Sequence, residues 1–162
     1  MEENWADALS GFVGVWQRVQ GSGPEPASGK TEPEYETMKC FIRSEAAGQR
    51  LYSALARLTE GRCADTFAGM AAECGRGLKR LQTVCFLVTG DTVIPETEQL
   101  PADGLLGYLR RAYLREGEAA RDYLRAAVSA EGEMLRSLYG ELAGRCTGRR
   151  EKLFGLADVI LG

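Results

Sequence analysis

The sequence contains no histidine among its 162 residues. Histidine is the most frequent general base in enzymes and one of the most frequent protein ligands of zinc and iron. Its absence excludes a catalytic Cys–His pair and every metal site that depends on an imidazole nitrogen. Any chemistry of this chain therefore relies on other side chains.

Other features are scarce or missing too. The net charge is −3 and the basic residues are spread along the chain, so nothing indicates a nucleic-acid partner. No apolar run approaches the ~20 residues of a membrane-spanning helix, and the N-terminal stretch MEENWADAL is acidic, unlike a secretory signal. The five cysteines are odd in number and form no Cys-x-x-Cys pair, which favours reduced thiols. We expect a cytoplasmic protein without nucleic-acid or membrane partners.

Three segments are expected along the chain. Residues 1–19 form a short amphipathic N-terminal helix with Trp5, Phe12 and Trp16 among its apolar residues. Residues 20–33 (QGSGPEPASGKTEP) have the composition of a linker. Residues 34–162 contain a four-helix bundle. The apolar face of the first segment is expected to dock on the bundle or to form part of a dimer contact.

Four helices are predicted, at about Pro33–Thr59, Cys63–Val88, Asp103–Ser129 and Gly132–Leu161, because apolar residues recur at alternating three- and four-residue spacing. The residues expected to face inward are, in order of helix, Met38, Phe41, Ile42, Glu45, Tyr52, Leu55 and Ala56; Phe67, Met70, Cys74, Gly77, Leu81 and Val84; Leu106, Leu109, Tyr113, Glu116, Ala120, Tyr123 and Ala127; and Leu135, Tyr139, Leu142, Cys146, Arg149, Leu153 and Ile160.

The lengths of the connections predict the topology. The first and last connections are only a few residues long, so each joins an antiparallel pair of helices. A helix of ~23 residues is ~35 Å long, and the ~13 residues of the middle link can span ~43 Å when extended. The link can therefore cross the whole bundle and make the second and third helices parallel. The expected fold is all-α, an up-down-down-up bundle with one long crossover.

An imperfect repeat lies within this pattern. Glu45 to Tyr52 reads EAAGQRLY and Glu116 to Tyr123 reads EGEAARDY, so each half has a Glu followed by a Tyr with six residues between them. Cysteines follow at nearly equal distances, at positions 74 and 146. Two related helix pairs that bring acidic residues into one core are typical of a carboxylate metal site. The helical spacing also places Arg149 and Gly77 in this layer.

On these residues the chain resembles a ferritin-like protein of the rubrerythrin type over about residues 38–160, in the stretches FIRSEAAGQRLYSALARL, AAECGRGLKRLQTVCFLVTG, LREGEAARDYLRAA and LYGELAGRCTGRREKL. In that family the first and third helices each provide a Glu, and the second and fourth each provide Glu-x-x-His, to bind two irons. The resemblance matches Glu45 and Glu116 to the single Glu ligands. It places Cys74 and Gly77, and Cys146 and Arg149, at the two Glu-x-x-His motifs. The resemblance thus implies the family's fold and the loss of its di-iron oxidoreductase activity.

Electrostatics explain why the residues do not suit two irons. Gly77 has no side chain, and Arg149 is permanently cationic where a metal ion would lie. Glu73 and Glu118 are expected to point about a hundred degrees or more away from the pocket. We expect Arg149 to bridge Glu45 and Glu116, with hydrogen bonds added by Tyr52 and Tyr123. One guanidinium opposite two carboxylates leaves a negative charge, so either one carboxylate takes up a proton or another cation or a water enters.

These residues leave several functions open. The leading hypothesis is a non-catalytic protein without a cofactor, which acts as an interaction or structural module with a protein partner or as a homodimer. The alternative is an oxidoreductase of peroxide stress that uses a single zinc or iron ion on Glu45, Cys74, Glu116 and Cys146, or a thiol pair. A disulfide between Cys74 and Cys146 requires Cα atoms within about 7 Å, which is less than the usual spacing of helices. A small ligand in the vacated pocket is a third possibility.

Overall fold

The computed structural model describes residues 32–162, and this part of the chain is entirely helical apart from its connections. Its four helices are α2 (Glu32–Arg57), α3 (Gly61–Thr89), α4 (Gly104–Ser129) and α5 (Glu133–Leu161). Each bound lies within two residues of the predicted one. The expected all-α class is confirmed. The predicted helix at 1–19, and the linker up to residue 31, lie outside the described residues.

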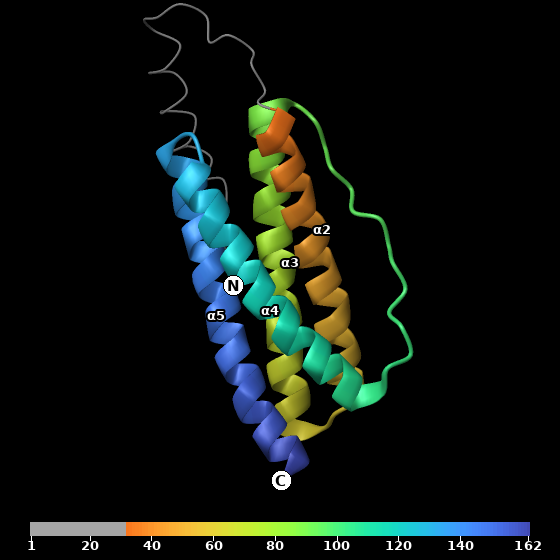
Figure 1. The fold of residues 1–162 in the computed structure, drawn as a ribbon. Coiled ribbons are helices and arrows are strands. Elements are labelled where there is room, and N and C mark those ends of the chain that lie inside the picture. The colour runs from red at the N-terminus through yellow and green to blue at the C-terminus, as the bar shows by residue number, and fades with distance from the viewer. Residues whose placement is uncertain (1–31) are drawn as a thin grey trace, which may run out of the picture. The chain divides into compact units, whose positions relative to one another are not determined.

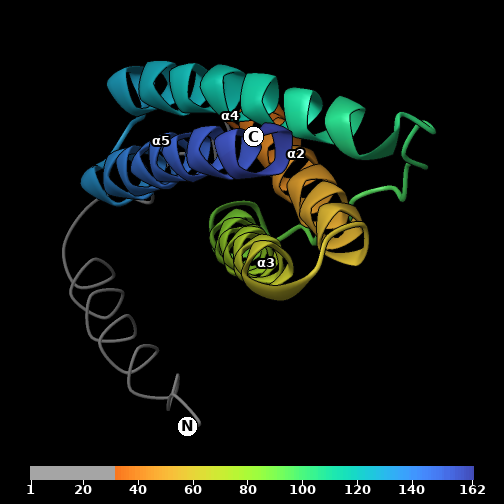
Figure 2. The same ribbon diagram turned by 90° about the horizontal axis from the view of Figure 1, so that it is seen from below.

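The helices associate as two pairs (Figure 1). The chain runs one way along α2 and returns along α3, and it does the same along α4 and α5. The link 90–103 runs the length of the bundle from the end of α3 to the start of α4, so these two helices point the same way. Seen along the bundle, α4 and α5 form one layer, and α2 and α3 lie beneath it (Figure 2).

The C-terminal end of α3 is capped by a glycine and tied to the link by a threonine. Gly90 follows α3 with a φ of 78° and donates its backbone N–H to the Phe86 carbonyl at 2.7 Å. This left-handed conformation favours glycine because it has no Cβ. The hydroxyl of Thr89 donates to the Cys85 carbonyl at 2.7 Å and accepts the Asp91 N–H at 3.1 Å, so it ties the start of the link to the helix.

Two further contacts hold the long link against the bundle. The Gln82 side chain donates to the Val93 carbonyl at 2.9 Å near the beginning of the link. The Tyr108 hydroxyl donates to the Pro101 carbonyl at 2.8 Å near its end. Val93 and Leu100 also pack against the core. The link is therefore attached at both ends of its path.

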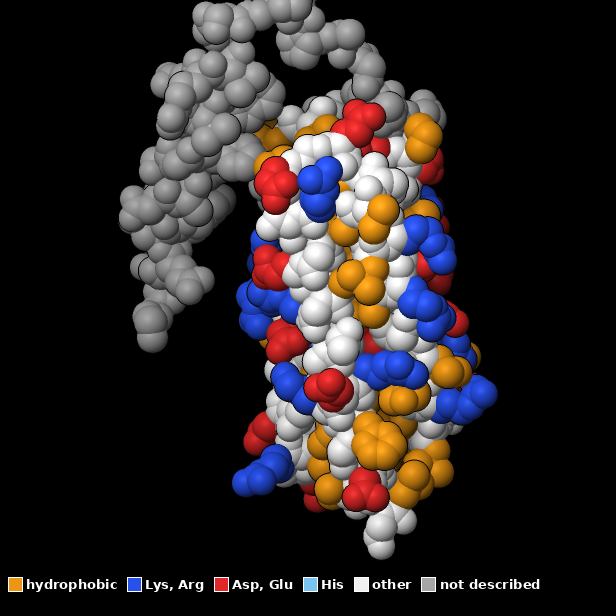
Figure 3. Space-filling model, turned by 60° about the vertical axis from the view of Figure 1, so that its left-hand side comes forward, with side chains coloured by type: hydrophobic (Ala, Val, Ile, Leu, Met, Phe, Trp, Pro, Cys, Tyr) orange, Lys and Arg blue, Asp and Glu red, His pale blue; other side chains and the backbone are white. Residues whose placement is uncertain are grey.

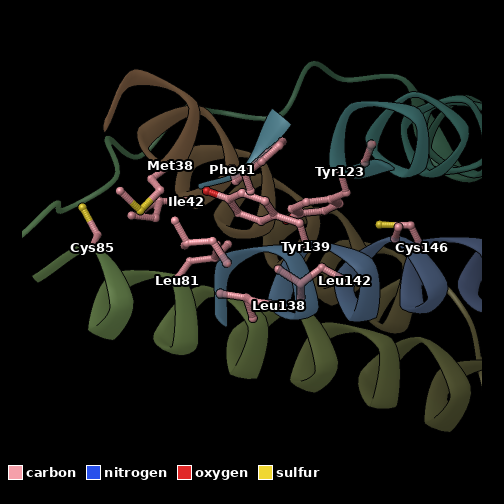
Figure 4. Packing of buried hydrophobic residues seen from close by; sticks show 14 residues of the cluster. Met38, Phe41, Ile42, Leu81, Cys85, Tyr123, Leu138, Tyr139, Leu142 and Cys146 are labelled. Carbon is pink, nitrogen blue, oxygen red and sulfur yellow. The ribbon is translucent and has the colours of Figure 1, made fainter. Parts of the chain in front are cut away.

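The core consists of two apolar clusters. The first contains an aromatic group in which the Phe41 ring lies 4.2 Å from that of Tyr123 and 5.2 Å from that of Tyr139, between centroids (Figure 4). The second cluster is built around Phe67, Met70 and Leu153. The buried polar and charged residues Glu45, Glu116 and Arg149 belong to neither cluster.

Most of the residues predicted to face inward are buried, with one clear exception. Leu106 was expected to face the core, but its side chain is 56% exposed. Its neighbour Leu105 packs against the second cluster instead. Leu105 is four residues before the buried Leu109 and Leu106 is three, so either position satisfies helical spacing. Tertiary packing decides between them at this helix end.

Candidate functional site

The two repeated glutamates lie fully buried and are linked crosswise between α2 and α4. The Tyr123 hydroxyl of α4 donates to Glu45 Oε1 of α2 at 2.8 Å. The Tyr52 hydroxyl of α2 donates to Glu116 Oε1 of α4 at 2.6 Å. Each Glu therefore accepts a hydrogen bond from the Tyr of the other repeat. Burial is the largest cause that raises the pKa of both tyrosines, so they remain neutral donors.

Arg149 of α5 lies between these carboxylates and is 1% exposed. Its Nε lies 3.2 Å from Glu116 Oε1, and its Nη2 lies 3.8 Å from Glu45 Oε1. Nη2 also donates to Cys146 Sγ at 3.4 Å. Burial lowers the pKa of Arg149, but its acidic neighbours together raise it above the ordinary value. Arg149 is therefore a buried cation beside both glutamates.

A second arginine, Arg115, was not identified from the sequence. Its Nη1 donates to Glu116 Oε1 at 2.7 Å, while Nη2 donates to the Ser44 carbonyl and to the Ser44 hydroxyl, the latter at 3.2 Å. A Cβ at Gly48 would lie only 2.6 Å from Arg115 Nη2, so this guanidinium occupies the space that the glycine leaves on α2. Glycine at position 48 was the only sequence signal for this contact.

The two arginines balance the two glutamates in charge. Two guanidinium groups thus lie beside the two glutamates, where the sequence predicted one. Arg115 is the additional cation. Glu45 Oε2, Glu116 Oε2 and Arg149 Nε nevertheless have no hydrogen-bond partner within the described residues. Arg149 Nε thus lies at ion-pair distance from Glu116 without hydrogen-bond geometry.

Gly77 of α3 is buried against this layer. A Cβ added there would lie 3.1 Å from Glu45 Oε2 and 3.4 Å from Leu142 Cδ2. The Glu45 carboxylate therefore takes up the volume that a side chain at this position would need. Gly77 makes room for a neighbour and contributes no ligand.

Cys74 and Cys146 are fully buried free thiols. Burial raises the pKa of Cys74 to about 12, although the charge of Arg149 acts in the opposite direction. Burial likewise raises the pKa of Cys146, and Glu116 adds to the effect. Both environments favour the neutral thiol, whereas nucleophiles and metal ligands act as thiolates.

Glu73 corrects one expectation from the sequence. It was predicted to point away from the pocket, yet its Oε2 lies 3.8 Å from Arg149 Nη1, and its Oε1 lies 3.5 Å from Lys152 Nζ. The Glu73 side chain is 25% exposed and reaches the network from its rim. The helical wheel gives the direction of the Cα atom, but the long Glu73 side chain reaches around the helix to Arg149. Glu73 and Lys152 therefore connect Arg149 with the surface.

The six residues predicted for the vestigial metal site, namely Glu45, Cys74, Gly77, Glu116, Cys146 and Arg149, are all buried. Within residues 32–162, no group of three or more Cys, Asp or Glu side chains is placed to hold a metal ion. None of the described helices is long and apolar enough to cross a membrane. Comparison with known proteins gave no match to a family model, a curated protein or a solved structure.

Proposed function

We propose that this chain is a ferritin-like bundle of the rubrerythrin type in which a network of arginines and glutamates takes the place of a di-iron site. In this proposal it is a non-catalytic protein that acts as an interaction or structural module. The observation that carries it is the position of Arg149, whose guanidinium lies 3.2 Å from Glu116 Oε1 and 3.8 Å from Glu45 Oε1. A permanent cation beside both carboxylates supplies positive charge where a metal ion would, but it cannot bind ligands as a metal does.

The residues present do not fit two iron ions. A di-iron centre needs several carboxylates and nitrogen ligands, but the positions of the two Glu-x-x-His motifs hold Cys74, Gly77, Cys146 and Arg149. Glu116 Oε1 already accepts from Tyr52 at 2.6 Å and from Arg115 at 2.7 Å. A metal ion bound to either glutamate would lie close to the guanidinium of Arg149, which would repel it.

Support for an interaction role comes from the surface. Hydrophobic side chains run between the charged ones along the face shown in Figure 3. On α5, Phe154 is 70% exposed and Leu161 is 68% exposed. They are seven residues apart, which is two helical turns, so they lie on the same face of α5. Exposed apolar residues on a shared face are typical of contact surfaces.

The oxidoreductase alternative lacks a comparable observation. A single zinc or iron ion on Glu45, Cys74, Glu116 and Cys146 would have to lie beside the guanidinium of Arg149, which is 3.2 Å from Glu116 and 3.8 Å from Glu45. A thiol that reduces peroxide needs a lowered pKa, whereas here the shift is upward. The metal content of the purified protein distinguishes this alternative from the proposal.

Metal content is the decisive measurement. Protein without an affinity tag is purified anaerobically from iron- and zinc-supplemented cultures and measured by elemental mass spectrometry. We expect well under one metal ion per chain and a melting temperature that does not change with EDTA. Near-stoichiometric iron or zinc that is lost in the Glu45→Ala/Glu116→Ala variant, while the Glu98→Ala control keeps it, would contradict the proposal in favour of the alternative.

A further inference from the structure

Helix α4 carries leucines and arginines interleaved on one exposed side. At about 100° per residue, these side chains fall within an arc of roughly 80° around the helix axis. The exposed residues of this arc are Leu106, Arg110, Leu114, Arg121, Leu124 and Val128. The opposite side of α4 packs into the bundle, where Leu109, Glu116 and Tyr123 are buried. The arc is therefore an amphipathic surface that no described element of the chain covers.

Helix α5 extends this surface through Arg150. Its guanidinium carbon lies 4.4 Å from the centroid of the Tyr113 ring, and a Cβ added at Gly117, the remaining position of the arc, would lie 3.3 Å from it. Because α4 and α5 are antiparallel, the residues after Arg150 lie beside the first half of α4. Phe154, about one helical turn further on, and Leu161, two turns beyond it, are 70% and 68% exposed. Together with the exposed residues of the arc, Arg150, Phe154 and Leu161 form the α4–α5 face.

The charge of the α4–α5 face is positive. Its three arginines form no ion pair within the described residues, whereas the other exposed arginines of α4 do: Arg111 pairs with Asp103, and Arg125 with Asp122. Glu118, the exposed acid of α4 closest to the arc, lies about 40° outside it and forms no ion pair with these arginines. Unpaired guanidinium groups between apolar side chains are suited to carboxylates at matching spacing.

The order of the residues distinguishes two kinds of partner. A membrane surface separates charged from apolar groups by depth, so interfacial helices carry basic residues on one face and apolar residues on the other. On α4 the arginines lie in the middle of the arc, with Leu106 and Leu124 at one edge and Leu114 at the other. Arginine and leucine also alternate along the axis, as the basic side chains among the hydrophobic ones in Figure 3 illustrate. This interleaving favours a partner helix with alternating acidic and apolar side chains.

We propose that the α4–α5 face binds an acidic amphipathic helix of a partner protein. The carboxylates of that helix pair with the three arginines of the face, and its apolar side chains pack against the leucines of α4 and Phe154 of α5. From Leu106 to Val128 the face is about 33 Å long, so a helix of about 22 residues covers it. The inference rests on the proposed function, because it names the class of partner of an interaction module.

A synthetic peptide serves as the probe. It is a capped helix of about 22 residues in which Leu and Glu alternate on one face, and Ala and Gln occupy the other. The full-length protein is titrated into fluorescently labelled peptide, and anisotropy reports binding. We expect saturable binding that weakens at least about tenfold between about 50 and 300 mM NaCl, because salt screens exposed charges. The same peptide with Lys in place of each Glu should bind at least about tenfold more weakly.

A charge-reversal variant and its matched control test the arginines. Arg110→Glu/Arg121→Glu reverses two charges of the face and should weaken peptide binding at least about tenfold. Arg76→Glu/Lys79→Glu makes the same charge change at exposed positions of α3 and should bind as the wild type does. All four side chains are exposed, so circular dichroism should show the wild-type helix content in both variants.

An aromatic pair tests the apolar part of the face. Phe154→Ser should weaken peptide binding at least about fivefold, because exposed aromatic residues are frequent anchors of interfaces. Phe86→Ser is the control, since Phe86 is 52% exposed on α3, outside the α4–α5 face. The control should leave the affinity unchanged.

The proposal is overturned if the Lys peptide or the Arg110→Glu/Arg121→Glu variant binds as tightly as the original pair. Binding to phosphatidylserine vesicles without binding to the peptide would also overturn it and assign the face to a membrane surface. Metal content is measured on the same preparation. Metal-free protein that does not bind the peptide contradicts this inference alone, whereas near-stoichiometric metal contradicts the proposed function whatever the peptide does.

Discussion

A single oxygen atom connects most of the buried network. Glu116 Oε1 accepts hydrogen bonds from Tyr52 and Arg115 and lies 3.2 Å from Arg149 Nε. Among the described residues Glu45 has fewer partners, because its Oε1 accepts a hydrogen bond from Tyr123 alone and lies 3.8 Å from Arg149. Removing a buried charge costs most when an opposite charge is left without compensation. The loss of either arginine is therefore expected to be more harmful than the loss of a surface charge.

The variant Arg149→Leu tests this expectation directly. It leaves two buried carboxylates against Arg115 alone, so the free energy of unfolding should fall by about 3–5 kcal/mol. Urea unfolding followed by circular dichroism measures the change. The control Arg76→Leu removes an exposed arginine of α3 and should shift stability by no more than about 0.5 kcal/mol. Equal stability of the two variants would show that the network does not hold buried charges.

The exposed cysteine should react with thiol reagents faster than the buried ones. Cys40 is exposed, whereas Cys74 and Cys146 are fully buried and burial raises the pKa of both. With iodoacetamide at pH 8 we expect rapid labelling of Cys40 and protection of Cys74 and Cys146 until urea unfolds the protein. Peptide mass spectrometry measures each site, with Cys40 as the internal control. Labelling of native Cys74 as fast as Cys40 would indicate an activated thiol and support the oxidoreductase alternative.

At the scale of the helices, the sequence predicted the bounds and buried faces well because both depend on local periodicity. It predicted that Glu45, Glu116 and Arg149 would be buried, since their spacing matches that of the surrounding apolar residues. It missed Arg115 because that residue lies beside Glu116, off the buried face, and reaches α2 only through the space at Gly48. Contacts that depend on a long side chain and a gap in another helix are tertiary properties, and helical periodicity does not report them.

Replacing a glycine by alanine should stabilise the protein at some helix positions and destabilise it at others. Gly144 of α5 is exposed, and a Cβ added there meets no atom within 4 Å. Gly144→Ala should therefore stabilise the protein by about 0.5–1 kcal/mol through helix propensity. At Gly77 the new Cβ would lie 3.1 Å from Glu45 Oε2, and Tyr123 holds that carboxylate in place. Gly77→Ala should destabilise by about 1–2 kcal/mol.

Thermal and urea unfolding of both variants measure the difference. The exposed Gly140, where an added Cβ also meets nothing within 4 Å, provides a second control and should behave as Gly144 does. A stabilising effect of Gly77→Ala equal to those of the two controls would mean that Glu45 can leave its position at no cost. The packing of Glu45 against Gly77 would then contribute nothing to stability.

At the scale of the whole bundle, residues 32–162 combine an apolar core with one charged layer. Each of the four helices contributes to this layer: α2 provides Glu45, α3 provides Gly77, α4 provides Glu116 and α5 provides Arg149. The layer therefore forms only when both antiparallel pairs come together in the correct relative position. Charged groups that compensate one another in one arrangement and remain unpaired in others disfavour misaligned packing. This gives the network a structural role in aligning the two helix pairs.

The long link provides the test at this scale, because it has to span the bundle. Helix α4 has 26 residues and is about 39 Å long. The 14 residues of link 90–103 can reach about 46–50 Å, so they suffice. Deleting Ile94 to Gln99 removes six residues, most of them exposed, and keeps the contacts at Val93 and Pro101. The remaining eight residues reach only about 26–29 Å.

We expect this deletion to prevent one chain from forming the bundle by itself and to give a domain-swapped assembly or an unfolded chain. The matched control inserts six Gly/Ser residues after Glu96, which costs less than about 0.6 kcal/mol because loop-closure entropy grows slowly with length. Light scattering after size exclusion, together with thermal unfolding, measures both variants. A deletion variant that keeps the wild-type oligomeric state and melts at the wild-type temperature would contradict the parallel arrangement of α3 and α4. The charged layer would then have to form with a different pairing of helices.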